Sequence, residues 1–78
     1  MEATMTLAEL CAKERYYRKK ANQAKEDAEM CLAESRSCES NLDSLIFLYM
    51  AECLTEDCDY FLKKHEEYYV GICQLLGL

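Results

Sequence analysis

The absence of proline is the feature that most constrains this chain, because proline and glycine are the residues that interrupt helices and mark turns. Glycine occurs only at Gly71 and Gly77, near the C-terminal end. Valine and isoleucine, which favour strands, are limited to Ile46, Val70 and Ile72. The sequence therefore predicts an all-α fold.

Length and charge narrow the class of protein further. The 78 residues allow one domain at most, since domains typically contain about 50–200 residues. Nine Lys and Arg against fifteen Asp and Glu give a net charge of −6, which repels nucleic acid and anionic lipid headgroups. A hydrophobic content of 51% is too high for an acidic disordered tail. We expect residues 1–78 to form one folded domain that binds no nucleic acid.

Two capping signals indicate where the helices begin. Thr6 and Glu9 form a capping box, which predicts a first helix over about residues 6–36. Ser35 to Asn41 contains three serines, whose side chains favour turns, so we expect a hairpin turn at about 37–40 and a second helix over about 41–76, capped by Ser40. One continuous helix through Cys38 is the alternative, because neither Gly nor Pro enforces the break.

A heptad repeat of mostly apolar residues predicts a coiled-coil-like seam between the two helices. Its positions are Leu7, Leu10, Glu14, Tyr17, Ala21, Ala24, Ala28, Cys31, Ser35, Cys38, Leu42, Leu45, Tyr49 and Glu52. Asp57 then interrupts the stripe, which resumes in a shifted phase at Phe61, Tyr68, Ile72 and Leu76. This shift predicts a kink near residues 55–59, or a break capped by Thr55 that would create a third helix.

The charge pattern favours an antiparallel hairpin. Residues 13–25 are basic and residues 41–78 are acidic, so a fold-back near residue 39 brings opposite charges together. It would set Arg18, Lys19 and Lys20 opposite Asp57, Asp59 and Tyr60. The same charges would also complement each other between two chains of an antiparallel dimer.

The six cysteines leave two interpretations open, which are reduced thiols that pack as small hydrophobic residues, or disulfides between helices. A fold-back centred on residue 42 would bring Cys11 level with Cys73 and Cys31 level with Cys53, whereas the turn residues favour a centre near 39. The paired arrangement resembles, in outline, the helical hairpins of the mitochondrial intermembrane space, although their CX9C and CX3C spacings are absent here.

No motif in the sequence indicates a catalytic, cofactor or metal site. The single histidine, His65, is too far from Cys58 and Cys73 along one helix to share a zinc ion, and we expect it at the surface among charged neighbours. We therefore expect a protein that is not an enzyme and needs no cofactor.

The apolar content exceeds what a two-helix hairpin can cover, because residues 45–51 are apolar around the whole helix. We expect the hairpin to associate with protein, as a homodimer or with another helical-bundle partner. The residues expected at the interface are Tyr16, Tyr17, Phe47, Leu48, Met50, Tyr68, Tyr69 and Ile72. The alternative is a third segment folding back to close a monomeric bundle.

Two functions follow from this reading. The first is a cytoplasmic helical interaction and oligomerisation module that self-associates or holds a partner helix, without inserting into a membrane, since the longest apolar run is too short to span one. The second is a small disulfide-stabilised helical hairpin acting outside the cytosol, either secreted or in the intermembrane space. A curved membrane-binding coat of the BAR type would need a strongly basic face, which the net charge of −6 does not favour.

Overall fold

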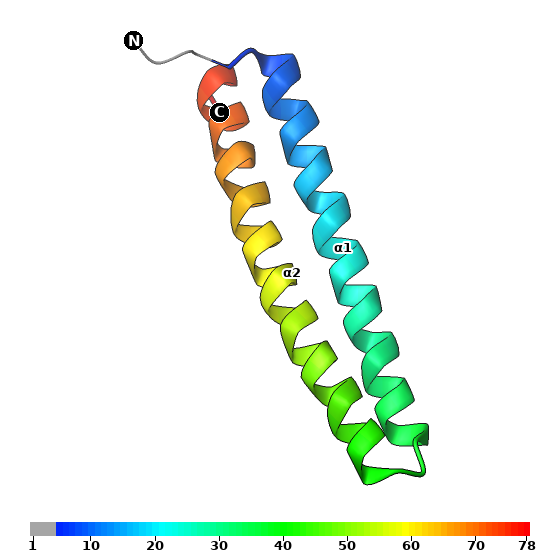
Figure 1. Cartoon of the computed structure of the whole chain (residues 1–78). Coiled ribbons are helices and arrows are strands. Elements are labelled where there is room, and N and C mark those ends of the chain that lie inside the picture. The colour runs from blue at the N-terminus through cyan, green and yellow to red at the C-terminus, as the bar shows by residue number, and fades with distance from the viewer. Residues whose placement is uncertain (1–4) are drawn as a thin grey trace.

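The computed structural model describes residues 5–78, which form two long helices, α1 (Leu7–Ser37) and α2 (Asn41–Leu76). The helices lie side by side and run in opposite directions, so the start of α1 is beside the end of α2 (Figure 1). The hairpin measures 55 × 23 × 16 Å. The predicted all-α antiparallel hairpin is confirmed. Neither helix of the described chain contains a stretch that is both long and apolar enough to span a bilayer.

Serine and threonine side chains cap both helix N-termini, as the sequence predicts. Thr6 Oγ1 accepts a hydrogen bond from the backbone N–H of Glu9 at 3.2 Å, and Ser40 Oγ accepts one from the backbone N–H of Asp43 at 3.4 Å. Each bond satisfies an N–H group that the first helical turn leaves without a partner. The capping residues therefore fix where each helix begins.

The C-terminal end of α2 is a Schellman motif. Gly77 adopts the left-handed conformation with φ of 75°, which residues with a Cβ rarely adopt. The backbone N–H of Leu78 donates to the carbonyl of Cys73 at 2.8 Å, and that of Gly77 donates to Gln74 at 3.2 Å. These bonds satisfy carbonyl groups that the last helical turn leaves free.

Serines take the place of glycine and proline at the turn, which occupies residues 38–40. The Ser37 hydroxyl donates to the carbonyl of Glu34 at 3.1 Å, in the last turn of α1. The Ser44 hydroxyl of α2 donates to the backbone carbonyl of Ser35 in α1 at 3.0 Å. The side-chain hydroxyls of Ser35 and Ser44 lie 3.1 Å apart. These short polar side chains hold the two helices together next to the turn.

The predicted heptad of α1 faces α2. The buried residues of α1 all belong to it: Glu14, Ala21, Ala24, Ala28, Cys31 and Ser35. Three of the six are alanines, which let the helix axes approach closely but each bury little apolar area. No large side chain in residues 5–78 is fully buried as a result.

The seam of α2 uses a different heptad from the predicted one. The buried and half-buried residues include an unbroken series of Ser44, Phe47, Ala51, Leu54, Cys58, Phe61, His65, Tyr68 and Ile72. The predicted seam residues Leu42, Leu45 and Tyr49 are 62–67% exposed on the opposite side. The prediction was wrong because it assigned the most apolar stripe of α2 to the seam. The alanines of α1 let the two helices approach closely, and the stripe with the small residues Ser44 and Ala51 fits that short separation.

Helix α2 continues through residues 55–59, where a kink or a break into a third helix was predicted. The Thr55 hydroxyl donates to the carbonyl of Ala51 at 2.8 Å, so it bonds within the helix instead of capping a new one. The charged residues Glu56, Asp57 and Asp59 are exposed and leave the seam uninterrupted. The apparent phase shift therefore arose from combining an outer stripe with the inner one.

Candidate protein interaction surface

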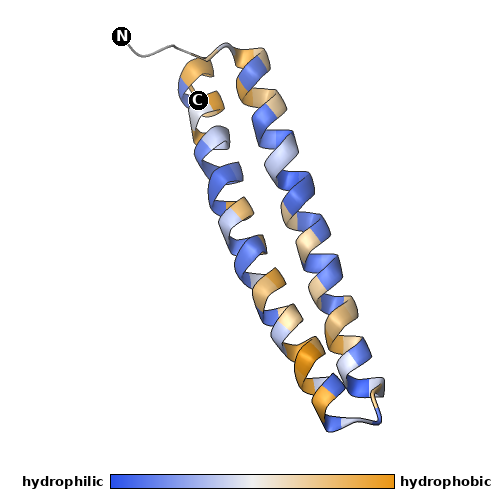
Figure 2. Cartoon of the chain, in the orientation of Figure 1, coloured by the Kyte–Doolittle hydropathy of each residue, from blue (hydrophilic) through white to orange (hydrophobic). Residues whose placement is uncertain are grey.

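An apolar outer stripe runs along the first three turns of α2, on the side that faces away from α1. It consists of Leu42, Leu45, Ile46, Tyr49 and Cys53. Leu42 and Tyr49 are each 67% exposed and Ile46 is 48% exposed. Figure 2 shows the strongly hydrophobic segment of α2 next to the turn. Large apolar side chains thus point into solvent along a helix whose other side already contacts α1.

The outer stripe has the spacing that a second helix would need. Leu42, Ile46, Tyr49 and Cys53 are separated alternately by four and three residues, which is the heptad pattern of helix–helix seams. The same positions further along α2 are mixed: Glu56, Lys63 and Glu67 are charged, and Tyr60, Val70 and Gln74 alternate with them. The continuous apolar surface therefore ends after three turns, where charged residues begin to interrupt it.

Neighbouring side chains widen this surface. Leu48 and Met50 flank the outer stripe and are each 43% exposed. Together with Leu42, Leu45, Ile46 and Tyr49 they expose on the order of 600 Å², at the upper end of the apolar patches found on monomeric proteins. A patch of this size is typical of a surface that contacts another molecule.

The structure separates the eight predicted interface residues into two groups. Tyr16, Leu48, Met50 and Tyr69 are exposed, with 43–55% of each residue accessible. The other four are half-buried at the seam between α1 and α2: Tyr17, Phe47, Tyr68 and Ile72. The outer stripe itself was missed as a surface, because its residues had been assigned to the inner seam. Testing which heptad continues unbroken to Ile72 would have identified it.

Polar neighbours at the far end of the outer stripe act on Tyr49. Hydrogen bonding to the Cys53 side chain and the negative charge of that group when ionised, followed by desolvation and the carboxylates of Glu56 and Glu52, raise the pKa of Tyr49. The raised pKa extends to higher pH the range over which Tyr49 keeps the neutral phenol that tyrosine has at neutral pH. A neutral side chain is the form that packs against another apolar surface at lowest cost.

The other half of the hairpin places aromatic side chains inside the seam. The ring of Tyr17 in α1 stacks on Tyr68 of α2, with centroids 5.6 Å apart and planes 7° apart. The ring centroid of Phe61 lies 6.2 Å from that of Tyr17. The ring of Tyr16 contacts the Tyr17 ring edge-on, with centroids 5.1 Å apart. This aromatic cluster joins the two helices within one chain.

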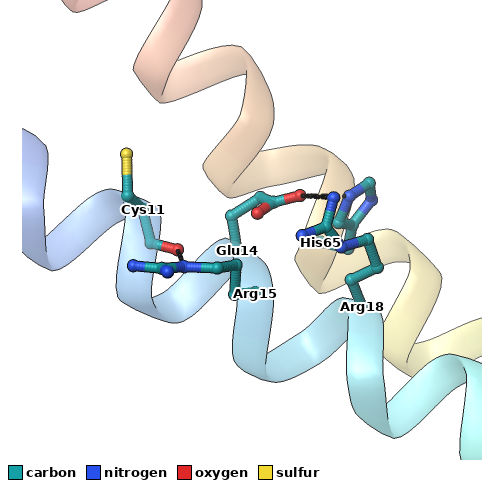
Figure 3. Close-up of polar contacts among 5 residues, drawn as sticks. All are labelled: Cys11, Glu14, Arg15, Arg18 and His65. Atoms are coloured by element: carbon teal, nitrogen blue, oxygen red, sulfur yellow. Dashed lines mark hydrogen bonds and ion pairs between the residues drawn. The ribbon is translucent and has the colours of Figure 1, made fainter.

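A polar pair crosses the seam next to the aromatic cluster (Figure 3). Glu14 Oε1 and His65 Nε2 lie 2.8 Å apart, and Arg18 reaches the same carboxylate at 3.5 Å. The side chain of Glu14 is 11% exposed and that of His65 is 26% exposed. The expectation of a surface His65 was therefore wrong, because the carboxylate of Glu14 supplies a polar partner within the seam.

The predicted pairing of basic residues in α1 with acidic residues in α2 was wrong, because the polar pair that crosses the seam joins an acid of α1, Glu14, to His65 of α2. Among residues 5–78, the other ion pairs join neighbours within one helix, Arg18 with Glu14 and Lys64 with Glu67. The basic run of α1 and the acidic residues of α2 are mostly exposed and do not meet across the seam. Exposed pairs of this kind contribute little to stability, so packing and not charge holds the hairpin.

All six cysteines are free thiols. The Ser35–Ser44 and Glu14–His65 contacts place the fold-back between residues 39 and 40, in agreement with the turn residues and not with a centre at residue 42. Cys31 and Cys53 are consequently displaced by about 7.5 Å along the helix axis, which adds to a helix separation of about 8–10 Å. This exceeds the ~7 Å between Cα atoms that a disulfide bridges.

Metal-ligand residues do not gather anywhere in the described chain, where no group of three or more His, Cys, Asp or Glu side chains is placed to hold an ion. The exposed outer stripe of α2 is therefore the surface feature that stands out from the rest of the hairpin. Comparison with protein-family models, with curated proteins and with solved structures finds no match to this chain.

Proposed function

We propose that this chain is a non-enzymatic oligomerisation module, and that it self-associates through the outer stripe of α2. The observation that supports the proposal is the exposure of Leu42, Leu45, Ile46 and Tyr49 on the side of α2 opposite to α1. Burying such residues against another helix is worth about 25 cal/mol per Å² of apolar area removed from water.

The distribution of side-chain sizes supports the same function. Near the turn, the seam between α1 and α2 consists largely of alanine, serine and cysteine, whereas the leucines and Tyr49 lie outside. A chain that functions as an isolated hairpin gains nothing from this arrangement, because its larger hydrophobic residues stay in water. A second helix covering the outer stripe converts those residues into a core.

A matched pair of substitutions tests the proposal. Ile46 in the outer stripe is 48% exposed, and Leu62, which lies in α2 outside the stripe, is 47% exposed. Sedimentation velocity over a concentration series should show the wild type associating. Ile46→Glu should weaken association at least tenfold, because it places a charge in the apolar contact. Leu62→Glu should change it less than threefold.

Circular dichroism provides the control for folding, since both variants change exposed residues and should keep the helix content of the wild type. A wild type that stays monomeric at the highest soluble concentration would contradict the proposal. Equal weakening by the two substitutions would contradict it as well, because association would then not depend on the outer stripe.

A further inference from the structure

We infer that the second copy binds antiparallel, with the two outer stripes in contact and the two hairpins overlapping only at their turn ends. This inference rests on the proposed self-association and specifies its geometry. A two-fold axis at the centre of the stripe, between residues 47 and 48, sets Ile46 against the partner's Tyr49 and Leu42 against the partner's Cys53. Such an interface is isologous and closed, so association stops at the dimer.

The acidic residues beyond the outer stripe select this orientation. In a parallel dimer, Glu56 of each chain would occupy the seam next to its own copy, and Glu52 and Asp59 would lie beside it. Like charges held together in this way are strongly unfavourable. In the antiparallel dimer the two Glu56 residues lie about 26 Å apart along the axis, each level with the partner's turn, so this seam contact between identical carboxylates is removed.

The charged half of α2 also limits how far the two hairpins overlap. A fully overlapped antiparallel dimer would set the outer stripe of one chain against a segment of the other that contains Lys63 and Glu67 beside Val70, all exposed on α2. Those charges would be desolvated against apolar side chains. An overlap restricted to the turn ends instead covers apolar residues with apolar residues.

The area of the patch fits a dimer of two such surfaces. With on the order of 600 Å² exposed on each copy, a symmetric contact buries at most about 1,200 Å² in total, which is the lower end of specific protein interfaces. The same geometry brings Leu48 and Met50 to the rim of the contact, where part of their area stays in water. The area therefore fits a weak, dissociable dimer.

Small-angle X-ray scattering on the associated wild-type protein distinguishes the orientations. The hairpin is 55 Å long, and an overlap of about 24 Å, which follows from the 1.5 Å rise per residue between the turn and the two-fold axis, gives a dimer about 85 Å long. A parallel or fully overlapped dimer would be about 55–60 Å long. A dimer of that shorter length would overturn the inference and leave the proposed function standing, whereas a monomer would overturn both.

Cysteine cross-linking gives an independent check on the orientation. The two Cys53 residues lie about 16 Å apart along the axis of the antiparallel dimer, too far for a disulfide, and adjacent in a parallel one. The dimer is treated with the thiol oxidant diamide, digested, and its cross-linked peptides are mapped by mass spectrometry. We expect less than about a tenth of the cross-linked product to join Cys53 to Cys53, and a major product at that pair would overturn the inference.

Discussion

The two ends of the hairpin are built in opposite ways. In the tip half, residues 28–53, the seam contains mostly small residues while Leu42, Ile46 and Tyr49 lie outside. In the open half, residues 7–24 and 54–76, the rings of Tyr17 and Tyr68 stack inside the seam. The outer positions of α2 there mix charged residues with exposed large ones such as Tyr60 and Val70. The open half therefore places an aromatic cluster inside the seam, whereas the seam of the tip half contains Phe47 among mostly small residues.

The difference indicates how stability and association are divided along the molecule. Aromatic packing of the open half stabilises the single hairpin, because stacked and edge-on rings add to the burial of their apolar area. The small residues of the tip half add little to that stability, but they bring the helices close together and turn the larger side chains outward. Substitutions in the two halves should consequently affect different measurements.

Replacing one aromatic residue in each half gives the largest expected contrast. Tyr17→Ala should lower the free energy of unfolding of the monomer by about 2–3 kcal/mol, less than a fully buried ring because Tyr17 is half-buried. Tyr49→Ala should change it by less than about 0.5 kcal/mol, since this ring is 67% exposed. Urea denaturation below the association concentration measures both values.

Both substitutions replace tyrosine by the best helix former, so the gain in helix propensity is the same and their difference reports packing alone. Sedimentation velocity should reverse the order, with Tyr49→Ala weakening association more than Tyr17→Ala does. Equal losses of unfolding free energy would contradict the proposed division between the two halves.

The Glu14–His65 pair offers a second, smaller contrast within the open half. His65→Ala leaves the mostly buried carboxylate of Glu14 with only the longer contact to Arg18, and should cost about 1–3 kcal/mol of unfolding free energy. Replacing both residues by leucine should be neutral or stabilise the hairpin by about 1–4 kcal/mol, because the desolvated polar pair becomes apolar packing. Urea denaturation of the two variants measures these changes.

A double-mutant cycle provides the control for this pair. The unfolding free energies of Glu14→Leu and His65→Leu are each measured alone. The coupling energy is the change caused by the double substitution minus the sum of the changes caused by the two single substitutions. A double-leucine variant less stable than the wild type would mean that the polar pair is worth more than the apolar packing that replaces it.

Local signals made the outline of the hairpin predictable from the sequence. The capping residues Thr6 and Ser40 act through hydrogen bonds to neighbours in the chain, so the starts of both helices could be predicted directly. The seam of α1 could also be predicted from the sequence, because a single apolar stripe dominates that helix. These features depend little on what lies across the seam.

The seam of α2 could not be read in the same way, because two stripes compete on that helix. Hydrophobicity alone favours Leu42 and Leu45, yet the helices approach closely at the alanines of α1 and accept Ser44 and Ala51. The location of His65 likewise depends on Glu14, 51 residues away in the sequence. Which face of α2 packs on α1, and where His65 lies, depend on how the two helices fit together. The apolar pattern of one helix alone does not carry that information.

Alkaline pH should give the smallest effect, and it acts on both halves. The negative charge of Glu67, followed by that of the Tyr60 phenolate when it is ionised, raises the pKa of Lys64 in the open half above its usual 10.5. The folded state therefore holds this proton more tightly than the unfolded state, so the resulting stability is complete below about pH 10.5 and is lost as the pH rises through the folded pKa. Lys64→Met should remove this part of the pH dependence.

The raised pKa of Tyr49 gives the corresponding test in the tip half. Its folded state favours the neutral phenol, so ionisation above pH 10 lowers stability in the same direction as loss of the Lys64 proton. Comparing Tyr49→Phe with Lys64→Met in urea titrations from pH 8 to 11.5 separates the two contributions. Because Tyr49 is largely exposed and the Lys64 side chain is 36% exposed, each change should be small. Only Tyr49→Phe should also reduce the loss of the dimer at alkaline pH, because the phenolate of Tyr49 would have to be desolvated against the partner's apolar stripe. Identical behaviour of the two variants in sedimentation would argue against an interface at Tyr49.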